Sequence, residues 1–174
     1  MTDFKDLVQL RRSHRQFTPE PLKPDELQLI LRAALMSPSA MHRRSWHFIV
    51  VDDKLTLEKL ADAKPTGAQF LKEAPVAVVV TGEPDSNECW VEDCSIAAVT
   101  MQYQAADLGL GSCWAQMRGH GLGDGTSSDA VIHGILNLPE NQEVLCVVAF
   151  GHSADERKPQ DENALKWENV IVNS

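Results

Sequence analysis

The sequence predicts an α/β or α+β fold built around a mixed sheet. About four short segments rich in β-branched residues alternate with segments of helical apolar period. One of them, 76–80, is a continuous run of Val and Ala, which is typical of a strand covered on both faces. The 174 residues are 43% hydrophobic and 24% charged, an ordinary composition for one globular domain. We therefore treat residues 1–174 as a single domain.

Apolar residues at helical spacing indicate where the helices lie. Phe4, Leu7 and Val8 form one apolar face, and Pro24 stands in the first turn of the next helix. Asn87 is a possible N-cap for a long helix rich in small residues, which favours either a core helix or a subunit-interface helix. The expected helices cover 2–10, 24 to before 38, 55–63, 66–73, 88–107 and 128–136.

The strands follow from runs of β-branched and aromatic residues. They are expected at 46–51, 76–80, 112–115 and 144–150. The last apolar run, 170–172, can add a strand to the chain's own sheet or to that of a partner. Four glycines within 117–127 predict a mobile loop before the last helix.

The charge balance argues against several classes of function. The net charge of −9 opposes binding to nucleic acid or to an anionic membrane surface. No segment has the roughly 20 apolar residues of a membrane span, and the first residues lack a signal-peptide pattern. The four cysteines form no C-x-x-C pair, so we expect buried thiols and neither a disulfide framework nor a zinc site among them. The expectation is a cytoplasmic protein.

A basic cluster stands out in this acidic chain. Arg11, Ser13 and Arg15 are two residues apart, so an extended backbone places their side chains on one side, where they could hold one phosphate group. A solvated basic turn explains the same residues, because charge runs usually face water. Both interpretations are open from these residues alone.

Four motifs, in order along the chain, resemble the nitroreductase family of FMN-dependent oxidoreductases. Residues 11–17, Arg-Arg-Ser-His-Arg-Gln-Phe, resemble its Arg-Arg-Ser-x-Arg-x-Phe opening. Residues 37–48 resemble its Pro-Ser-x-x-Asn-x-Gln-Pro-Trp-x-Phe loop, and 109–114 match its Gly-Leu-Gly-Ser-Cys-Trp segment. Residues 151–159 resemble its closing Gly-Tyr-Pro-x-Glu-x-Lys-x-Pro turn. The resemblance is to the short, minimal members of the family.

This resemblance implies an α+β nitroreductase-like fold with a central, mostly antiparallel mixed sheet flanked by helices. It also implies a homodimer with FMN at the subunit interfaces and a C-terminal extension that reaches onto the partner. In the family, the first motif binds the phosphate and the pyrimidine edge of the flavin, and the closing turn also contacts the phosphate. The loop lines the flavin, usually from the other subunit, and the third segment runs along the ring near N5. The matching cofactor-binding residues are Arg11, Arg12, Ser13, Arg15, Pro38, Ser39, Ala40, His42, Trp114, Ala115, Gln116, Arg157 and Lys158.

Four positions depart from the family's pattern. His42 stands where the family usually has Asn, and Gln160 where many relatives have Arg. Arg44 and Ser45 replace the usual Gln-Pro, so the loop loses a fixed φ and gains a charge. Three of these departures fall in the loop at 37–48, and Gln160 directly follows the closing turn.

The implied activity is a two-step exchange. NAD(P)H passes a hydride to flavin N5, and a small electron-poor acceptor such as a nitroaromatic or quinone then takes the nicotinamide's place. The cofactor carries the chemistry, so no catalytic side chain is assigned, and Arg15 is expected to stabilise the reduced flavin.

Three other interpretations remain at this point. A flavin-binding module of the same fold with little turnover is the main alternative. A nucleic-acid patch could combine the basic cluster with 42–47, where Trp46 would stack on bases, although the net charge opposes it. A metal site at His14, His42 and His47 has no standard spacing.

Overall fold

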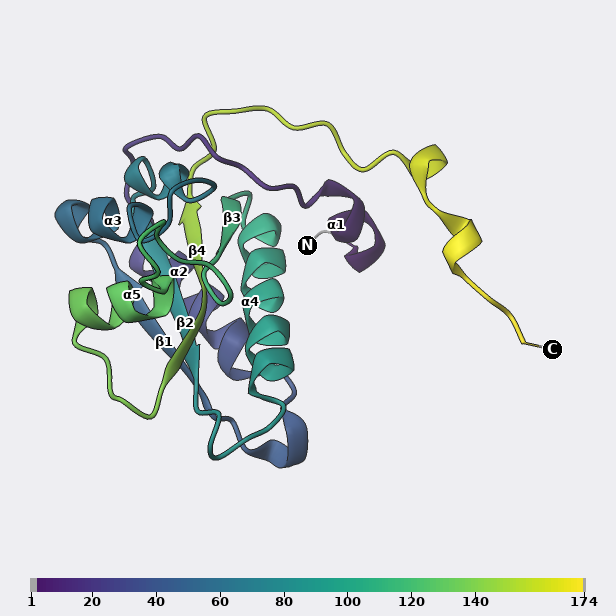
Figure 1. Cartoon of the computed structure of the whole chain (residues 1–174). Coiled ribbons are helices and arrows are strands. Elements are labelled where there is room, and N and C mark those ends of the chain that lie inside the picture. The colour runs from purple at the N-terminus through teal and green to yellow at the C-terminus, as the bar shows by residue number, and fades with distance from the viewer. Residues whose placement is uncertain (1–2, 174) are drawn as a thin grey trace.

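The computed structural model describes residues 3–173 (Figure 1), which form five α-helices and four strands. The helices are α1 (Phe4–Leu10), α2 (Pro24–Leu35), α3 (Lys54–Ala61), α4 (Trp90–Asp107) and α5 (Ser128–Leu136). The strands are β1 (Trp46–Val51), β2 (Val76–Gly82), β3 (Gly111–Gln116) and β4 (Glu143–Gly151). None of the helices in 3–173 combines the length and the hydropathy that crossing a membrane requires.

The strands form one sheet in the order β1-β2-β4-β3, with every neighbouring pair antiparallel. Parallel pairing in 3–173 is confined to a single bridge between Ser13 and Ser112. The predicted α+β class with a mostly antiparallel sheet is therefore confirmed. β1 and β3 are the edge strands.

Two cores lie on opposite faces of this sheet. Val76, Val78 and Val80 of β2 join the core formed with α2 and α4, whereas Ala77 and Val79 join the core formed with α3 and α5. All of β2 is buried, as its unbroken apolar sequence predicted. Figure 1 shows α4 lying along one face of the sheet, with α3 and α5 on the other side.

The expected helix at 66–73 is wrong except for a 3-10 turn at Gln69–Lys72. Pro65 and Gly67 precede this turn, and Gly67 has a left-handed φ of 80° that no regular helix contains. Asn87 is not the N-cap of α4, because the N-cap is Cys89. The side-chain oxygen of Asn87 instead accepts from the Cys89 N–H at 3.0 Å, before the helix begins.

The C-terminal segment leaves the body of the molecule (Figure 1). It forms 3-10 turns at Glu162–Ala164 and Trp167–Asn169 rather than a continuous extended chain. The apolar run 170–172 adds no strand to the chain's own sheet, and Ile171 is 90% exposed. A lone strand has no partner for its backbone groups and gains too little burial to form.

Candidate functional site

Three of the four motifs meet at one end of the sheet. The segment that follows α1 lies beside the start of β3, where the His14 N–H donates to the Ser112 carbonyl at 3.0 Å. The same segment then pairs with the chain beyond β4, through an antiparallel bridge between Phe17 and Ser153. Main-chain hydrogen bonds thus join residues that are about 100 and 140 positions apart in sequence.

Two glycines allow this close approach. A Cβ at Gly111 would lie 3.0 Å from the His14 Cβ, and one at Gly151 would lie 2.7 Å from the Pro75 Cδ and 2.9 Å from the Phe17 Cδ1. A side chain at Gly151 would therefore force Pro75 or Phe17 to shift, and one at Gly111 would press tightly against His14, so glycine suits both positions.

The predicted basic cluster converges at this junction. Burial raises the pKa of the Cys113 thiol, while the charges of Arg15, Arg11 and Arg157 and the Ser13 hydroxyl act on it in the opposite direction. Residues of the first motif and of the closing turn therefore lie near enough to the buried Cys113, in β3, to act on its thiol. Arg11, Ser13 and Arg15 thus share a neighbour, as alternate positions on an extended chain allow, and Arg157 approaches the same thiol from the other end of the sequence.

Hydrogen bonds of Arg12, His14 and Arg157 connect the first motif to the closing turn or hold the closing turn together. The Arg12 guanidinium donates to the Lys158 and Pro159 carbonyls, the second at 3.3 Å, and so holds the closing turn. His14 Nδ1 lies 2.8 Å from one oxygen of Asp155, and Arg157 Nε donates to the other at 2.8 Å. Burial raises the pKa of Asp155, but these hydrogen bonds and the two nearby cations outweigh burial and lower it overall.

The third motif lies in β3 and continues away from the cluster. Trp114 Nε1 donates to the Gln116 side chain at 2.9 Å, which fixes both side chains along the strand. Ala115 is buried. Lys64, which is only 8% exposed, donates to the Gln116 backbone carbonyl at 2.9 Å. Sequence reasoning missed Lys64, because a single lysine in a short turn carries no pattern.

The second motif, the loop with Pro38, Ser39, Ala40 and His42, lies at the opposite end of α4. Ala40 contacts Asp93 in the first turn of α4, whereas the Arg11 guanidinium lies over the Tyr103 ring, with 5.9 Å to its centroid. Asp93 and Tyr103 are ten residues apart in α4, and ten residues of helix span about 15 Å. Within a single chain, the loop and the basic cluster are therefore far apart. Figure 1 shows the two segments at opposite ends of the molecule.

The predicted loop has an unusual backbone. Met41, His42 and Arg44 have φ values of 51°, 55° and 50°, in the left-handed region that residues with a Cβ rarely adopt. Loops that hold such residues are often functional. Within 3–173 no cluster of three or more His, Cys, Asp or Glu side chains could hold a metal ion, and His14 and His47 instead pair with carboxylates.

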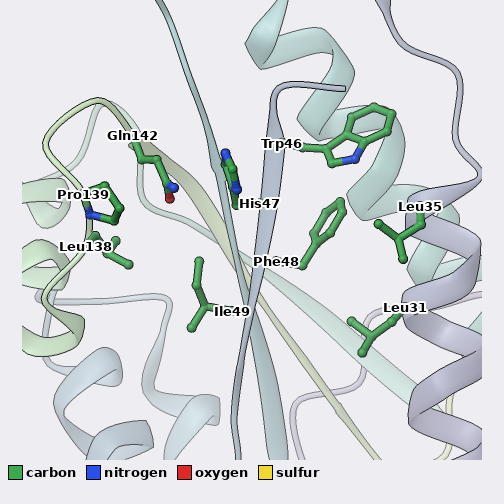
Figure 2. Close-up of a pocket in the computed structure, with 9 residues that line it drawn as sticks. All are labelled: Leu31, Leu35, Trp46, His47, Phe48, Ile49, Leu138, Pro139 and Gln142. Atoms are coloured by element: carbon green, nitrogen blue, oxygen red, sulfur yellow. The ribbon is translucent and has the colours of Figure 1, made fainter. Parts of the chain in front are cut away.

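A groove follows the outer edge of β1. Figure 2 shows Phe48 of β1 directed toward Leu31 and Leu35 of α2, and Ile49 on the other side of the strand toward Leu138. This edge carries unpaired backbone groups, since β1 has a strand on one side only in the described chain.

The fold is α+β, and an arginine cluster lies at one end of its sheet. The model of the nitroreductase family matches residues 8–67 and 61–152. A putative NADH dehydrogenase/NAD(P)H nitroreductase of Archaeoglobus fulgidus is 33% identical over 161 residues, which are 90% of this chain and 89% of that protein. An FMN reductase [NAD(P)H] of Bacillus subtilis is 25% identical over 93% of this chain and 72% of its own length.

Solved structures give the same result. An FMN-dependent nitroreductase from Clostridium difficile R20291 has a TM-score of 0.94 and 38% identity, covering 97% of this chain and 98% of that one. The chain therefore belongs to the nitroreductase family. The fold and family expected from the four motifs are confirmed.

Proposed function

We propose that this protein is an FMN-dependent oxidoreductase that takes a hydride from NAD(P)H and delivers it to a small electron-poor acceptor of the nitroaromatic or quinone type. The observation that carries the proposal is the convergence of Arg11, Arg15, Arg157 and Ser13 at the start of β3. In a chain with a net charge of −9, such a local concentration of cations calls for an anionic ligand.

The residues present fit this cofactor. The Arg11 and Arg15 guanidinium groups and the Ser13 hydroxyl suit a phosphate and the electron-rich edge of a flavin ring, while Arg157 is paired with Asp155. Bound FMN would supply the hydride chemistry, as an acceptor from the nicotinamide and a donor to the second substrate. Arg15 would stabilise negative charge on the cofactor, and buried Lys64 fixes the backbone at Gln116 beside the proposed ring position.

A complete site requires a second copy of the chain. The loop 38–42 and the basic cluster stand at opposite ends of α4, so we place the loop of one subunit over the cluster of its partner. Exposed apolar side chains support a subunit interface along α1 and α4: Phe4, Val8, Leu10, Ile96 and Val99.

The C-terminal segment supports the same dimer. Trp167, Ile171 and Val172 are 70%, 90% and 82% exposed, which is costly for a segment that stays in water. We propose that this segment of one copy covers the partner, where the apolar groove along the unpaired edge of β1 (Figure 2) offers both apolar contacts and backbone partners. Four free thiols suit the reducing cytoplasm, where we place the protein.

The test is an absorption spectrum of the purified protein, followed by heat release and identification of any bound chromophore. We expect about one FMN per chain, and NAD(P)H oxidation that accelerates when a nitroaromatic or quinone is added. FMN binding without acceptor reduction would favour the alternative of a flavin-binding module. A protein that takes up no FMN, even when FMN is added, would refute both.

A further inference from the structure

The loop between α2 and β1 is anchored by a carboxylate that no motif includes. Asp93, in the first turn of α4, is 3% exposed. Both of its oxygens lie 3.0 Å from the Ala40 backbone nitrogen, and Oδ2 also accepts from Asn87 Nδ2 at 2.8 Å. Burying an anion is unfavourable unless hydrogen bonds and local dipoles compensate. Here two neutral donors and the positive end of α4 do so.

The same asparagine reaches the other end of the loop. Asn87 Nδ2 donates to Ser45 Oγ at 2.9 Å, and both residues are buried. The Glu83 N–H donates to the Ser45 carbonyl at 3.1 Å, and the Arg43 guanidinium donates to the Ser86 carbonyl. The first turn of α4 thus holds the start of the loop, through Ala40 and Asp93, and the connection between β2 and α4 holds its end, through Ser45.

The loop needs such anchoring because of its backbone. Met41, His42 and Arg44 lie between the two anchor points, and all three are left-handed. Residues with a Cβ keep this conformation only where their surroundings impose it. Within the loop, the Arg44 N–H donates to Ser39 Oγ at 3.2 Å, one further contact that favours the observed shape.

Ser45 is held by side-chain hydrogen bonds, whereas a proline at this position would restrict the backbone by itself. The family's usual proline at this position fixes φ covalently, and Ser45 lacks that restraint. Its hydroxyl is instead held by Asn87, which is itself held by Asp93. In this chain, a buried hydrogen-bond network therefore restricts the conformation of the loop in place of a rigid proline.

We propose that Asp93, together with Asn87 and Ser45, is a positioning group that presets the loop 40–44 in its flavin-binding shape. This inference rests on the proposed function for the loop's ligand, but the anchoring itself can be measured without FMN. A preset loop binds its ligand more tightly because less conformational entropy is lost on binding. None of the three side chains needs to touch the cofactor.

The test replaces Asp93 by Asn, which keeps the shape of the side chain. One carboxylate oxygen becomes an NH2 group, which cannot accept the hydrogen bond from the Ala40 N–H or from the Asn87 amide. The apoprotein's amide hydrogen exchange, followed by NMR, should accelerate at Ala40 by about tenfold or more, while core amides such as Val79 keep the parent rate. The dissociation constant for FMN should rise by about tenfold in fluorescence titrations. Ser45→Ala, a milder change, should shift both quantities in the same direction.

Glu92→Gln is the matched control, since Glu92 lies in the same helical turn but is exposed. It should change neither the Ala40 exchange nor the FMN affinity. Unchanged exchange at Ala40 in both Asp93→Asn and Ser45→Ala would overturn the anchoring. Faster exchange at Ala40 with unchanged FMN affinity would overturn the positioning role. A parent protein that binds no FMN would refute the proposed function and the positioning role, whereas the exchange at Ala40 would still decide the anchoring.

Discussion

The two ends of α4 hold the two parts of the candidate site by different means. At one end, Arg11 and Arg15 stand on an extended segment fixed by main-chain pairing to β3 and to the chain after β4. At the other end, the loop 40–44 has three left-handed residues and is fixed by buried side chains, above all Asp93. In the proposed function, the first end would bind FMN through the charge of its side chains, and the second through the shape of its backbone. They should therefore fail in different ways when altered.

The largest effect should come from breaking each end in a different subunit. Arg15→Ala removes charge from one end, and Ala40→Trp places bulk in the loop at the other. Either variant alone should lose most of its FMN binding, by at least about tenfold for Arg15→Ala. When the two variants are mixed and allowed to exchange subunits, each mixed dimer should contain one intact site. About a quarter of the parent's FMN sites should then return, measured by flavin titration.

The control for this experiment is Arg32→Ala, which removes an exposed arginine from α2 and should bind FMN like the parent. Mixing Arg15→Ala with itself should restore nothing. If the mixture of Arg15→Ala and Ala40→Trp also restored nothing although subunit exchange was demonstrated, both ends would serve a site within one chain, and the proposed arrangement of the dimer would be wrong.

A smaller effect should follow from loosening the main-chain junction at the basic end. Gly151→Ala places a methyl group 2.7 Å from the Pro75 Cδ, so the pairing near Phe17 must shift. We expect a loss of about 1–3 kcal/mol in unfolding free energy and weaker FMN binding. Gly134→Ala is the matched control, because its Cβ meets nothing within 4 Å in α5. That variant should be stabilised by about 0.5–1 kcal/mol. Thermal melts measure both variants. Equal changes in melting temperature for Gly151→Ala and Gly134→Ala would show that the close contacts of Gly151 are not the cause.

The same contrast explains how much the sequence could predict. The fold followed from the periodicity of the segments, and the unbroken run 76–80 correctly predicted a strand with a core on both faces. The nearness of Arg11, Ser13 and Arg15 to one neighbour, Cys113, agrees with their spacing, since alternate residues of an extended chain share a side. Local spacing and charge decide these features, and a sequence displays both.

The loop end was predicted only in part. The motif at 37–48 located the loop, but no pattern indicated that Asp93 and Asn87 hold it, because their contacts bridge 42 to 53 positions of sequence. Asn87 was predicted to cap α4, since an asparagine before a helix is usually a cap. Its amide is instead used by Ser45 and Asp93. Lys64 escaped prediction for the same reason, because its partner is a backbone carbonyl far along the chain.

The smallest expected effect is a difference between the two ends in how they make the stability of the fold depend on pH. Each end holds a histidine–carboxylate pair, His14 with Asp155 and His47 with Glu83, at 2.8 and 2.7 Å. Hydrogen bonds from His47 and Ser86 lower the pKa of Glu83, and those from His14 and Arg157 lower the pKa of Asp155 against the effect of its burial. A carboxyl group whose pKa is lower in the folded protein stabilises the fold above its unfolded pKa. That stability is lost as the pH falls through the folded value.

Asp155→Asn should therefore lower the melting temperature near neutral pH and reduce its decline in acid, so that variant and parent converge below the ordinary aspartate pKa of 3.8. Glu83→Gln should behave likewise, with convergence below 4.5. Its change should be smaller, because the Glu83 side chain is 28% exposed and that of Asp155 only 12%, so water screens the Glu83 pair more. Melting curves across this pH range test both, and a decline in Asp155→Asn as steep as the parent's would show that Asp155 does not hold the closing turn.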